Sequence, residues 1–338
     1  MNHATDTSRQ NPQGEARPRV LHVVDLPGAG WDALAAAARC AQSLPADQRL
    51  LLIGDRCAAA DAAAFGLRPD YRLCPPLNRL AASVGPLDRL IKGVSRVWPI
   101  DVVHVWSDSA RVLCRQTLGF HFPLIQEDPA LFAPPLLPQD RASVRSSLGI
   151  APHETALLLA SDRPGVGDTR RFTGLVSLLA FAELAVVGIA GSRGDSFRRA
   201  ARFMRGFNRY WDVIPIRTPP HTALAAADIV IYDQGDSLTA DAGPGPRTGG
   251  IVLTAGAMGI PVVTTDSPLA RRLVGPLAQR ALAVGGGLPD LATRTLPLAT
   301  DASIRAQAGR DLHNHTATLP APGLMERWVT ACSQGAAA

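Results

Sequence analysis

Lysine is nearly absent from the 338-residue sequence, because Lys92 is the only one, and aromatic residues make up only 5% of the chain. The basic charge is therefore almost entirely arginine, and 34 basic against 29 acidic residues leave a net charge of +5. No dense basic stripe interleaved with aromatic residues occurs, so the composition does not favour dedicated nucleic-acid binding. With 46% apolar and 19% charged residues, the chain has a globular composition and is long enough for two ordinary domains.

Cysteines are few and far apart, and none forms a C-x-x-C pair. The five are Cys40, Cys57, Cys74, Cys114 and Cys332. An odd number at such spacing does not fit a zinc site or a disulfide framework, and it is typical of a reduced cytoplasmic chain. Residues 1–17 are polar, mixed in charge and without an apolar segment, so we interpret them as a disordered leader and not as a signal peptide.

No stretch is a convincing membrane span, although residues 173–191 carry a single charge, Glu183. A span needs about 20 apolar residues, whereas three glycines interrupt this run and its character changes midway. Residues 175–181 have the pattern of a helix and residues 185–189 that of a strand. We therefore predict a buried helix followed by a buried parallel strand, and leave peripheral contact with a membrane open.

Short β-branched runs alternate with Ala-, Leu- and Arg-rich segments of helical length, which predicts βαβ units and parallel sheets. In the first half, strands are expected at 20–24, 49–53 and 101–105, and helices at 31–43, 87–97 and 110–116. In the second half, strands are expected at 155–160, 185–189, 212–216, 228–232 and 261–264, and helices at 172–181, 196–207 and 222–226. The sequence thus predicts an α/β protein with two doubly wound domains.

The boundary between the two domains is expected within a proline-rich segment. Residues 128–138 contain four prolines, which neither a helix interior nor a central strand accepts. The predicted division is a leader at 1–17, a first domain at 18–127, a linker at 128–150, a second domain at 151–322, a closing helix at 323–332 and a tail at 333–338. Ligands of open α/β sheets bind at the carboxyl ends of the strands, so we expect a cleft between the two domains.

Several segments resemble, in order and spacing, the family 4 glycosyltransferases of the GT-B fold. The segments are "RVLHVVDLPGAGWDALAAAARCAQSL", "PIDVVHVWSDSA", "EDPALFAPP" with "DRASVRSSLGIAPHETALLLAS", "AAADIVIYD", "IVLTAGAMGIPVVTTDSPLARRLVG" and "PGLMERWVTACS". They extend from about Arg19 to Cys332. The resemblance implies two Rossmann-like domains facing across a cleft, of which the first is shortened. It also implies a retaining, metal-independent transfer from a nucleotide sugar to an acceptor, with no other cofactor.

Gly28 and Gly30 follow the first predicted strand and precede a helix. Glycines at this point let the backbone approach a diphosphate, which the positive end of the helix then favours. The match is only G-x-G, so a tight turn between strand and helix is the alternative reading. The resemblance places the loop at the cleft.

The resemblance assigns the donor diphosphate to the second domain. The family has an arginine and a lysine in the loop after the first strand of that domain, and here Arg163 matches the arginine and Arg170 or Arg171 the lysine. Two cations there offset the charge that develops on a departing nucleoside diphosphate. Gly249 and Gly250 fall where backbone N–H groups would meet a phosphate. A solvated basic loop is the alternative.

Two glutamates that the family carries at its donor-site helix are missing. The alignment places Thr254 at the glutamate that holds the nucleotide ribose, and Pro246 at its partner. Thr254 can accept a ribose hydrogen bond, but without charge.

The resemblance also marks a candidate catalytic residue, His104, which matches the first histidine of the family's "D-V-V-H-x-H-S" strand. The second histidine is replaced by Trp106, and His121 is either a relic of the cleft or a loop residue. A strand-end histidine that only packs is the alternative for His104. His313 and His315 do not share a helix face, so no metal site is predicted.

Two functions remain open at this point. The first is a glycosyltransferase with the donor against the second domain and an unidentified acceptor entering from the first. The second is a non-catalytic protein of the same fold that binds a nucleotide or a partner. The retained glycine loop and arginines favour the enzyme, whereas the missing glutamates favour the binding protein.

Overall fold

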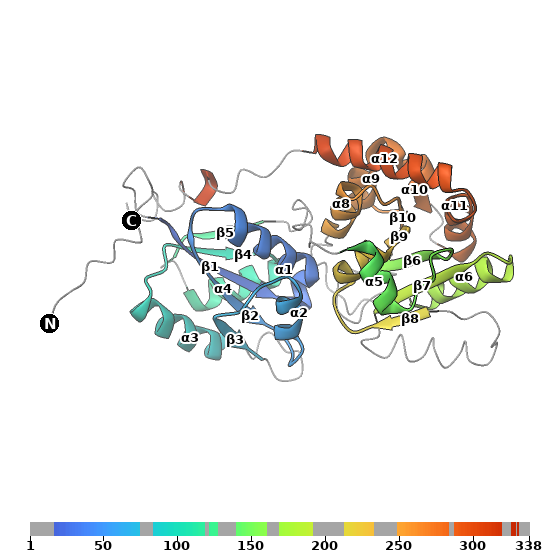
Figure 1. The fold of residues 1–338 in the computed structure, drawn as a ribbon. Helices are drawn as coiled ribbons and strands as arrows, with labels where there is room; N and C mark the ends of the chain where they lie inside the picture. Colours follow the sequence, from blue (N-terminus) through green and yellow to red (C-terminus); the bar gives the residue numbers. More distant parts are fainter. Residues whose placement is uncertain are drawn as a thin grey trace.

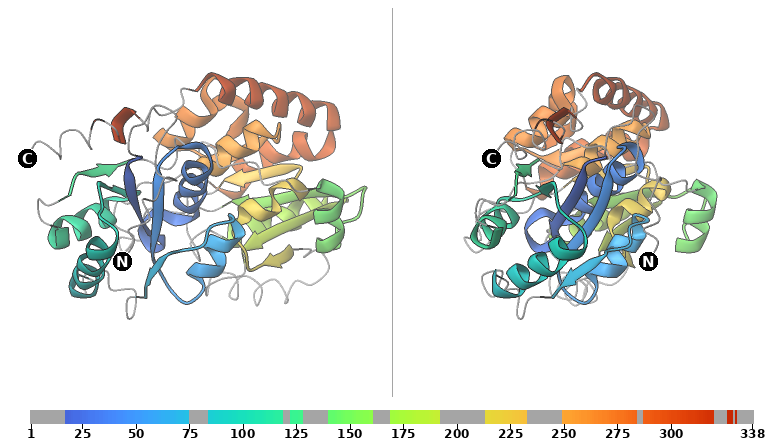
Figure 2. Two further views of the ribbon diagram at one scale, coloured as in Figure 1. Left: turned by 60° about the vertical axis from the view of Figure 1, so that its left-hand side comes forward. Right: turned by 90° about the vertical axis from the view of Figure 1, so that its left-hand side faces the viewer.

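The structure is a computed structural model with two parallel sheets in separate halves of the molecule, which lie side by side (Figure 1, Figure 2). It describes residues 17–74, 84–118, 122–127, 140–160, 169–191, 213–232, 249–283, 287–319, 326–328 and 330.

The first sheet has five parallel strands in the order β3-β2-β1-β4-β5. The strands are β1 (Arg19–Asp25), β2 (Asp47–Ile53), β3 (Tyr71–Leu73), β4 (Val102–Val105) and β5 (Leu124–Gln126). Its central strand β1 pairs on both sides, so that Val23 lies opposite Leu51 and Val105. Apolar residues on both faces of β1 are fully buried, as expected for a strand in the middle of a parallel sheet.

Helices cover both faces of the first sheet. On one face lie α1 (Leu26–Ser43) and α2 (Ala58–Ala64), whose apolar side chains share a core with Val20 and Val24. On the other face lie α3 (Val84–Val97) and α4 (Asp108–Leu118), which pack on Leu21 and Val23. Alternate residues of β1 therefore serve two different cores.

The second sheet has six parallel strands in the order β11-β10-β9-β6-β7-β8. The strands are β6 (Thr155–Ala160), β7 (Val186–Gly191), β8 (Val213–Ile216), β9 (Ile229–Tyr232), β10 (Val262–Thr265) and β11 (Leu282–Ala283). Every residue of β6 is buried, which explains its unbroken run of small and aliphatic side chains.

The second sheet is also covered on both faces. One face carries α6 (Thr169–Phe181) and α11 (Leu288–Thr300). The other carries α5 (Arg141–Leu148), the 3-10 helix η5 (Pro220–Ala226), α8 (Gly250–Ala257) and α9 (Pro268–Val274), with α12 (Ala302–Thr318) packed against α8. The short η6 (Gly275–Leu277) and α10 (Ala278–Ala281) connect α9 to β11.

Both sheets have the doubly wound strand order. In each sheet, the first strand in sequence lies in the middle. The second and third strands in sequence lie on one side of it, and the fourth lies next to it on the other side. The order therefore reverses between β1 and β4 in the first sheet and between β6 and β9 in the second. The predicted α/β fold with two Rossmann-like domains is confirmed, and the first sheet is the smaller of the two.

The apolar run at residues 173–191 forms a helix and a strand, as predicted. Helix α6 ends at Phe181, and β7 begins at Val186. Between them Glu183 adopts a left-handed conformation, with φ at 60°. Within the described ranges, no helix combines the length and apolarity that a membrane crossing requires.

Helix α5 lies inside the segment predicted as a linker and belongs to the second unit by its contacts. It is capped by Asp140, which accepts a hydrogen bond from Ser143 N, and by Gly149 in the left-handed conformation with φ at 73°. Arg145 at its end donates to Asp228 at 2.9 Å and to three backbone carbonyls. This network fixes α5 against the start of the second sheet.

Residues 326–328, near the C-terminal end of the sequence, lie against the first unit (Figure 1). The side chain of Trp328 is fully buried in the core under α1, and Arg327 forms an ion pair with Glu127. The residues of the second unit thus lie between two stretches of chain that build the first.

Candidate functional site

The two points of strand-order reversal mark where a ligand is expected, because the helices that follow the central strands diverge there. In the first unit, α1 begins after β1 and α4 after β4. In the second unit, α6 is the helix that follows β6, and α8 is the helix between β9 and β10. Helix α1 contacts α8, so the carboxyl ends of the two sheets approach each other at these helices.

The predicted arginines of the second domain lie at the start of α6. Arg170 is exposed and Arg171 is half-buried, both in the first turn of that helix. Arg163 lies outside the described residues. Guanidinium groups beside a helix N-terminus are of the kind that can donate to a phosphate-bearing ligand.

Gly249 and Gly250 lie at the start of α8, and both are buried. A side chain at Gly249 has no room, because its Cβ would lie 2.0 Å from Cδ1 of Leu273. The close packing of α9 therefore explains this glycine without a ligand. The N–H of Gly250 donates a hydrogen bond to a side chain that was not predicted from the sequence.

That acceptor is Asp32 of the first unit. Its Oδ2 accepts a hydrogen bond from Gly250 N at 2.7 Å, and its Oδ1 lies 2.7 Å from Nε2 of His221 in η5. Asp32 is 2% exposed, and His221 is equally buried beside the ring of Phe65. A carboxylate of α1 thus occupies the helix end that was predicted to bind the donor diphosphate.

Thr254, predicted at the ribose, lies one turn further along α8. It is 4% exposed, and its hydroxyl donates to the carbonyl of Gly250 at 3.0 Å. Such a bond within the helix uses the only donor of the side chain. Pro246 lies outside the described residues.

The glycine loop of the first unit is the start of α1. Gly28 falls in the first turn, and Gly30 interrupts the helix with φ at 71° and ψ at −171°. A positive φ is readily adopted only by glycine, so Gly30 is required by the backbone. The kink precedes Trp31, which is buried in the core of the first unit, and Asp32, which contacts the second unit.

A second buried carboxylate, Asp25, lies at the carboxyl end of β1. It accepts hydrogen bonds from Ser107 at 3.0 Å and from Ser109 at 2.5 Å, and the two hydroxyls lie 3.1 Å apart. Asp25 and Ser107 are fully buried, whereas Ser109 is half-buried. This cluster spans the strand-order reversal of the first sheet, and it was not predicted because Asp25 is more than 80 positions away from the two serines.

His104 lies in the middle of a buried aromatic cluster. Its ring is fully buried, 5.1 Å from the ring of His22, 4.2 Å from that of Trp106 and 5.5 Å from that of Trp328. Within the described part of the chain, neither ring nitrogen of His104 has a hydrogen-bond partner. This environment agrees with the packing alternative, while the catalytic role of His104 stays a prediction.

Burial sets the protonation of both histidines in this cluster. Desolvation lowers the pKa of His104 well below its usual value, and the nearby His22 and Arg327 lower it further. Desolvation also lowers the pKa of His22 to about 4, against the hydrogen bond with Gln48 at 3.0 Å. Both rings are therefore neutral at pH 7.

No group of three metal-ligating side chains occurs among the described residues. His313 instead lies at the end of α8, where Nδ1 is 3.2 Å from the carbonyl of Gly256 and 3.1 Å from that of Ala257. It therefore contacts two carbonyls at the C-terminal end of that helix. His121 lies outside the described residues.

Solved structures match this fold over most of its length, although no family model and no curated protein sequence matches the chain. A UDP-GlcNAc 2-epimerase from Neisseria meningitidis, bound to UDP-GlcNAc, is 11% identical with a TM-score of 0.62, covering 92% of this chain and all 100% of that one. A sucrose-phosphate synthase from Thermosynechococcus elongatus is 12% identical with a TM-score of 0.59, covering 94% and 97%. A glycosyltransferase from Rickettsia africae is 10% identical with a TM-score of 0.59, covering 95% and 99%.

These likenesses define a class of fold. The chain has the two-domain GT-B-like architecture shared by glycosyltransferases and UDP-GlcNAc 2-epimerases. Because the sequence identities are low, these similarities establish only the architecture. The chemistry depends on the residues described above.

Proposed function

We propose that the chain binds a nucleoside-diphosphate sugar between its two units and transfers the sugar to an acceptor, as a divergent member of the family 4 glycosyltransferases. The observation that carries the proposal is the meeting of the two strand-order reversals through α1 and α8. One side supplies arginines and helix N-termini for a diphosphate. The other supplies Asp25 with two serine hydroxyls for an acceptor.

The diphosphate is placed between the first turns of α6 and α8. Arg170 and Arg171 flank one helix start, and the N–H of Gly250 belongs to the other. A diphosphate there has to displace the carboxylate of Asp32, because both are anions that use the same N–H group. Donor binding is therefore coupled to release of the contact between the units.

In the proposed transfer, the bond between the anomeric carbon and the donor phosphate oxygen breaks, and the same carbon forms a bond to an acceptor oxygen. The leaving diphosphate keeps the electron pair, and the arginines stabilise the charge that develops on it. The acceptor hydroxyl passes its proton to Asp25 through Ser109. We propose a course without metal and with retention of anomeric configuration.

A stability screen tests the binding half of this proposal. Nucleoside diphosphates and nucleotide sugars are compared by thermal unfolding with nucleoside monophosphates and pyrophosphate, and a ligand at a hundred times its dissociation constant adds about 2.7 kcal/mol. Arg170→Ala/Arg171→Ala should then weaken the selected diphosphate about tenfold or more in calorimetric titration. The matched control is Arg272→Ala, an exposed arginine of α9. Unchanged affinity in the double variant would contradict this placement.

Asp25→Asn tests the chemical half. The carboxamide keeps the shape of the side chain but cannot take a proton, so release of nucleoside diphosphate from the sugar donor should fall about 100-fold or more. Affinity for the diphosphate should stay unchanged, because the substitution lies on the acceptor side. Equal rates for the two proteins would remove Asp25 from the mechanism.

Two observations favour a second candidate, a nucleotide-binding protein without catalysis. Asp32 fills the end of α8, and the hydroxyl of Thr254 is bound to its own helix. Under this alternative a nucleotide sugar stabilises the protein, yet neither water nor any acceptor receives the sugar. Diphosphate release after long incubation at saturating donor separates the two candidates.

A further inference from the structure

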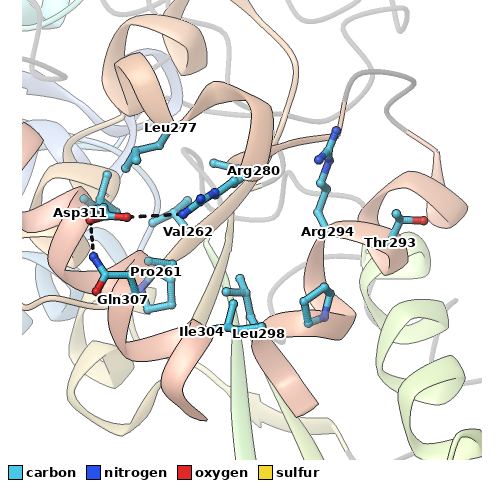
Figure 3. A pocket seen from close by; sticks show the side chains of 14 residues that line it. Pro261, Val262, Leu277, Arg280, Thr293, Arg294, Leu298, Ile304, Gln307 and Asp311 are labelled. Carbon is cyan, nitrogen blue, oxygen red and sulfur yellow. Dashed lines mark hydrogen bonds and ion pairs between the residues drawn. The ribbon is translucent and has the colours of Figure 1, made fainter. Parts of the chain in front are cut away.

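The second unit contains a cavity of about 430 Å³ that lies away from the proposed donor site (Figure 3). Pro261 and Val262, at the amino-terminal end of β10, form part of its wall, and η6, α10, α11 and α12 supply the rest. Gly250 and its partner Asp32 of the first unit lie instead at the carboxyl end of the second sheet. The volume falls within the range of ligand pockets, about 300–1,000 Å³.

Aliphatic side chains form one side of the cavity. Leu298 of α11 and Leu312 of α12 are buried, and Ile304 of α12 is 45% exposed at the mouth. Figure 3 shows Ile304 and Leu298 next to each other, on the side opposite Arg294 and Arg280. An exposed isoleucine beside buried leucines gives a continuous apolar surface from the solvent inward, which suits an apolar ligand body.

The other side carries positive charge. Arg294 of α11 is half-buried and has no carboxylate partner in the part of the chain that the structure describes. Arg280 of α10 lies 3.7 Å from Asp311, which also accepts a hydrogen bond from Gln307 at 2.6 Å. Two guanidinium groups against one carboxylate leave a net positive charge, so the lining complements an anionic head group.

Helix α11 contains Pro297 where it lines the cavity. Pro297 has no N–H and cannot bond to the carbonyl of Thr293 one turn earlier, and both residues line the cavity.

We propose that this cavity binds a small amphipathic anion, with an alkyl or ring body against Leu298, Ile304 and Leu312 and a carboxylate or phosphate at Arg294 and Arg280. The site is separate from the nucleotide site. Its ligand is a free small molecule of this chemistry, whether a fatty carboxylate or an alkyl phosphate.

The test is calorimetric and thermal-shift titration of the full chain with decanoate and with decyl phosphate, below the concentrations at which they form micelles. Decanol and decyltrimethylammonium are the uncharged and the cationic probes. One anion should bind per chain, roughly tenfold more tightly than decanol. The stronger of the two anions identifies the head group.

Two variants locate the binding. Arg280→Gln/Arg294→Gln should reduce the affinity of the anions to that of decanol, whereas Arg272→Gln, outside the cavity, should leave it unchanged. Ala308→Phe should fill the cavity and abolish binding of every probe. Circular dichroism checks that each variant is folded, and the double arginine variant decides the question if Ala308→Phe is not.

The proposal is overturned if neither anion binds, if the cationic probe binds as well as the anions, or if both anions keep their affinity in the double arginine variant. None of these measurements involves a nucleotide. Their results therefore do not depend on whether the chain binds a nucleotide sugar.

Discussion

Asp32 and Asp228 are carboxylates that make the same kinds of contact, one backbone N–H and one or more cationic or imidazole side chains, but Asp32 connects the two units and Asp228 lies within one. Each carboxylate accepts one backbone N–H, from Gly250 for Asp32 and from Ala156 for Asp228. Asp228 joins elements of a single unit and is bound by Arg145 and Arg141, at 2.9 and 2.7 Å. Asp32 joins two units and faces an imidazole, His221.

Asp228 therefore stabilises the second unit internally, whereas Asp32 connects the two units. Asp228 lies before β9, at the amino-terminal edge of the second sheet, where ligands of doubly wound sheets do not bind. Asp32 lies at the carboxyl edge, on a helix end that favours any anion. We therefore expect that a competing anion can replace Asp32, whereas loss of Asp228 should destabilise the start of the second sheet.

Removal of Asp228 is expected to have the largest effect. Asp228→Leu leaves the buried guanidinium of Arg145 without its anion, which costs about 3–5 kcal/mol of unfolding free energy. The control is Asp266→Leu, because Asp266 is as exposed as Asp228 but pairs with Arg271, which is 64% exposed. Such a solvent-exposed pair contributes little to stability, so Asp266→Leu should cost much less than Asp228→Leu. Urea denaturation measures both, and similar losses would refute the distinction.

The second largest effect is expected from lowering the pH, which should reduce the stability of the first unit. Burial lowers the pKa of His22 to about 4, whereas the unfolded chain titrates near 6.5. Between these values the unfolded state binds a proton that the folded state does not, so stability is complete above about pH 6.5 and falls as the pH drops toward 4. The loss from His22 is about 3 kcal/mol, and His104 adds to it in the same direction.

The control for the pH prediction is His104→Leu, which removes one of the two buried imidazoles. Its unfolding free energy should depend less steeply on pH between about 6.5 and 4 than that of the parent. Denaturation at several pH values measures the slope. An identical slope in both proteins would mean that the cluster opens before it is protonated.

Asp32→Asn is expected to have the smallest effect, a change in the affinity for a nucleoside diphosphate. The carboxamide still accepts the N–H of Gly250, but it no longer brings a negative charge to the place of the diphosphate. The nucleoside diphosphate chosen by the stability screen should bind several-fold to tenfold more tightly, a difference of at most ~1.4 kcal/mol. Asp88→Asn, on the exposed pair with Lys92, serves as the control. Unchanged affinity would place the diphosphate away from α8.

The central strands were predictable because burial on both faces demands unbroken apolar runs. The strands expected at 20–24 and 155–160 are observed as β1 and β6. Edge strands β3 and β11 were missed, since three and two residues leave no periodicity to recognise. Helix α11 was missed as well, because it contains Pro297 and begins with a proline in its first turn.

The candidate site was only half predictable. A helix start after a buried strand is visible in the sequence, and Gly249, Gly250, Arg170 and Arg171 lie at such starts. Asp32 was not identified, because its partner Gly250 is 218 positions away and an acid near a helix N-terminus has an ordinary local role. Contacts between domains carry no local periodicity, so the sequence offers no signal for them.

The return of the C-terminal segment has a consequence for how the chain is made. Trp328 completes the core of the first unit, although nearly all other residues of that core precede residue 126. Domains usually fold in order as the ribosome releases them. Here the unit that is synthesised first is finished last, after the second unit has already left the ribosome. Until then the core under α1 lacks Trp328, which is one of its largest fully buried side chains.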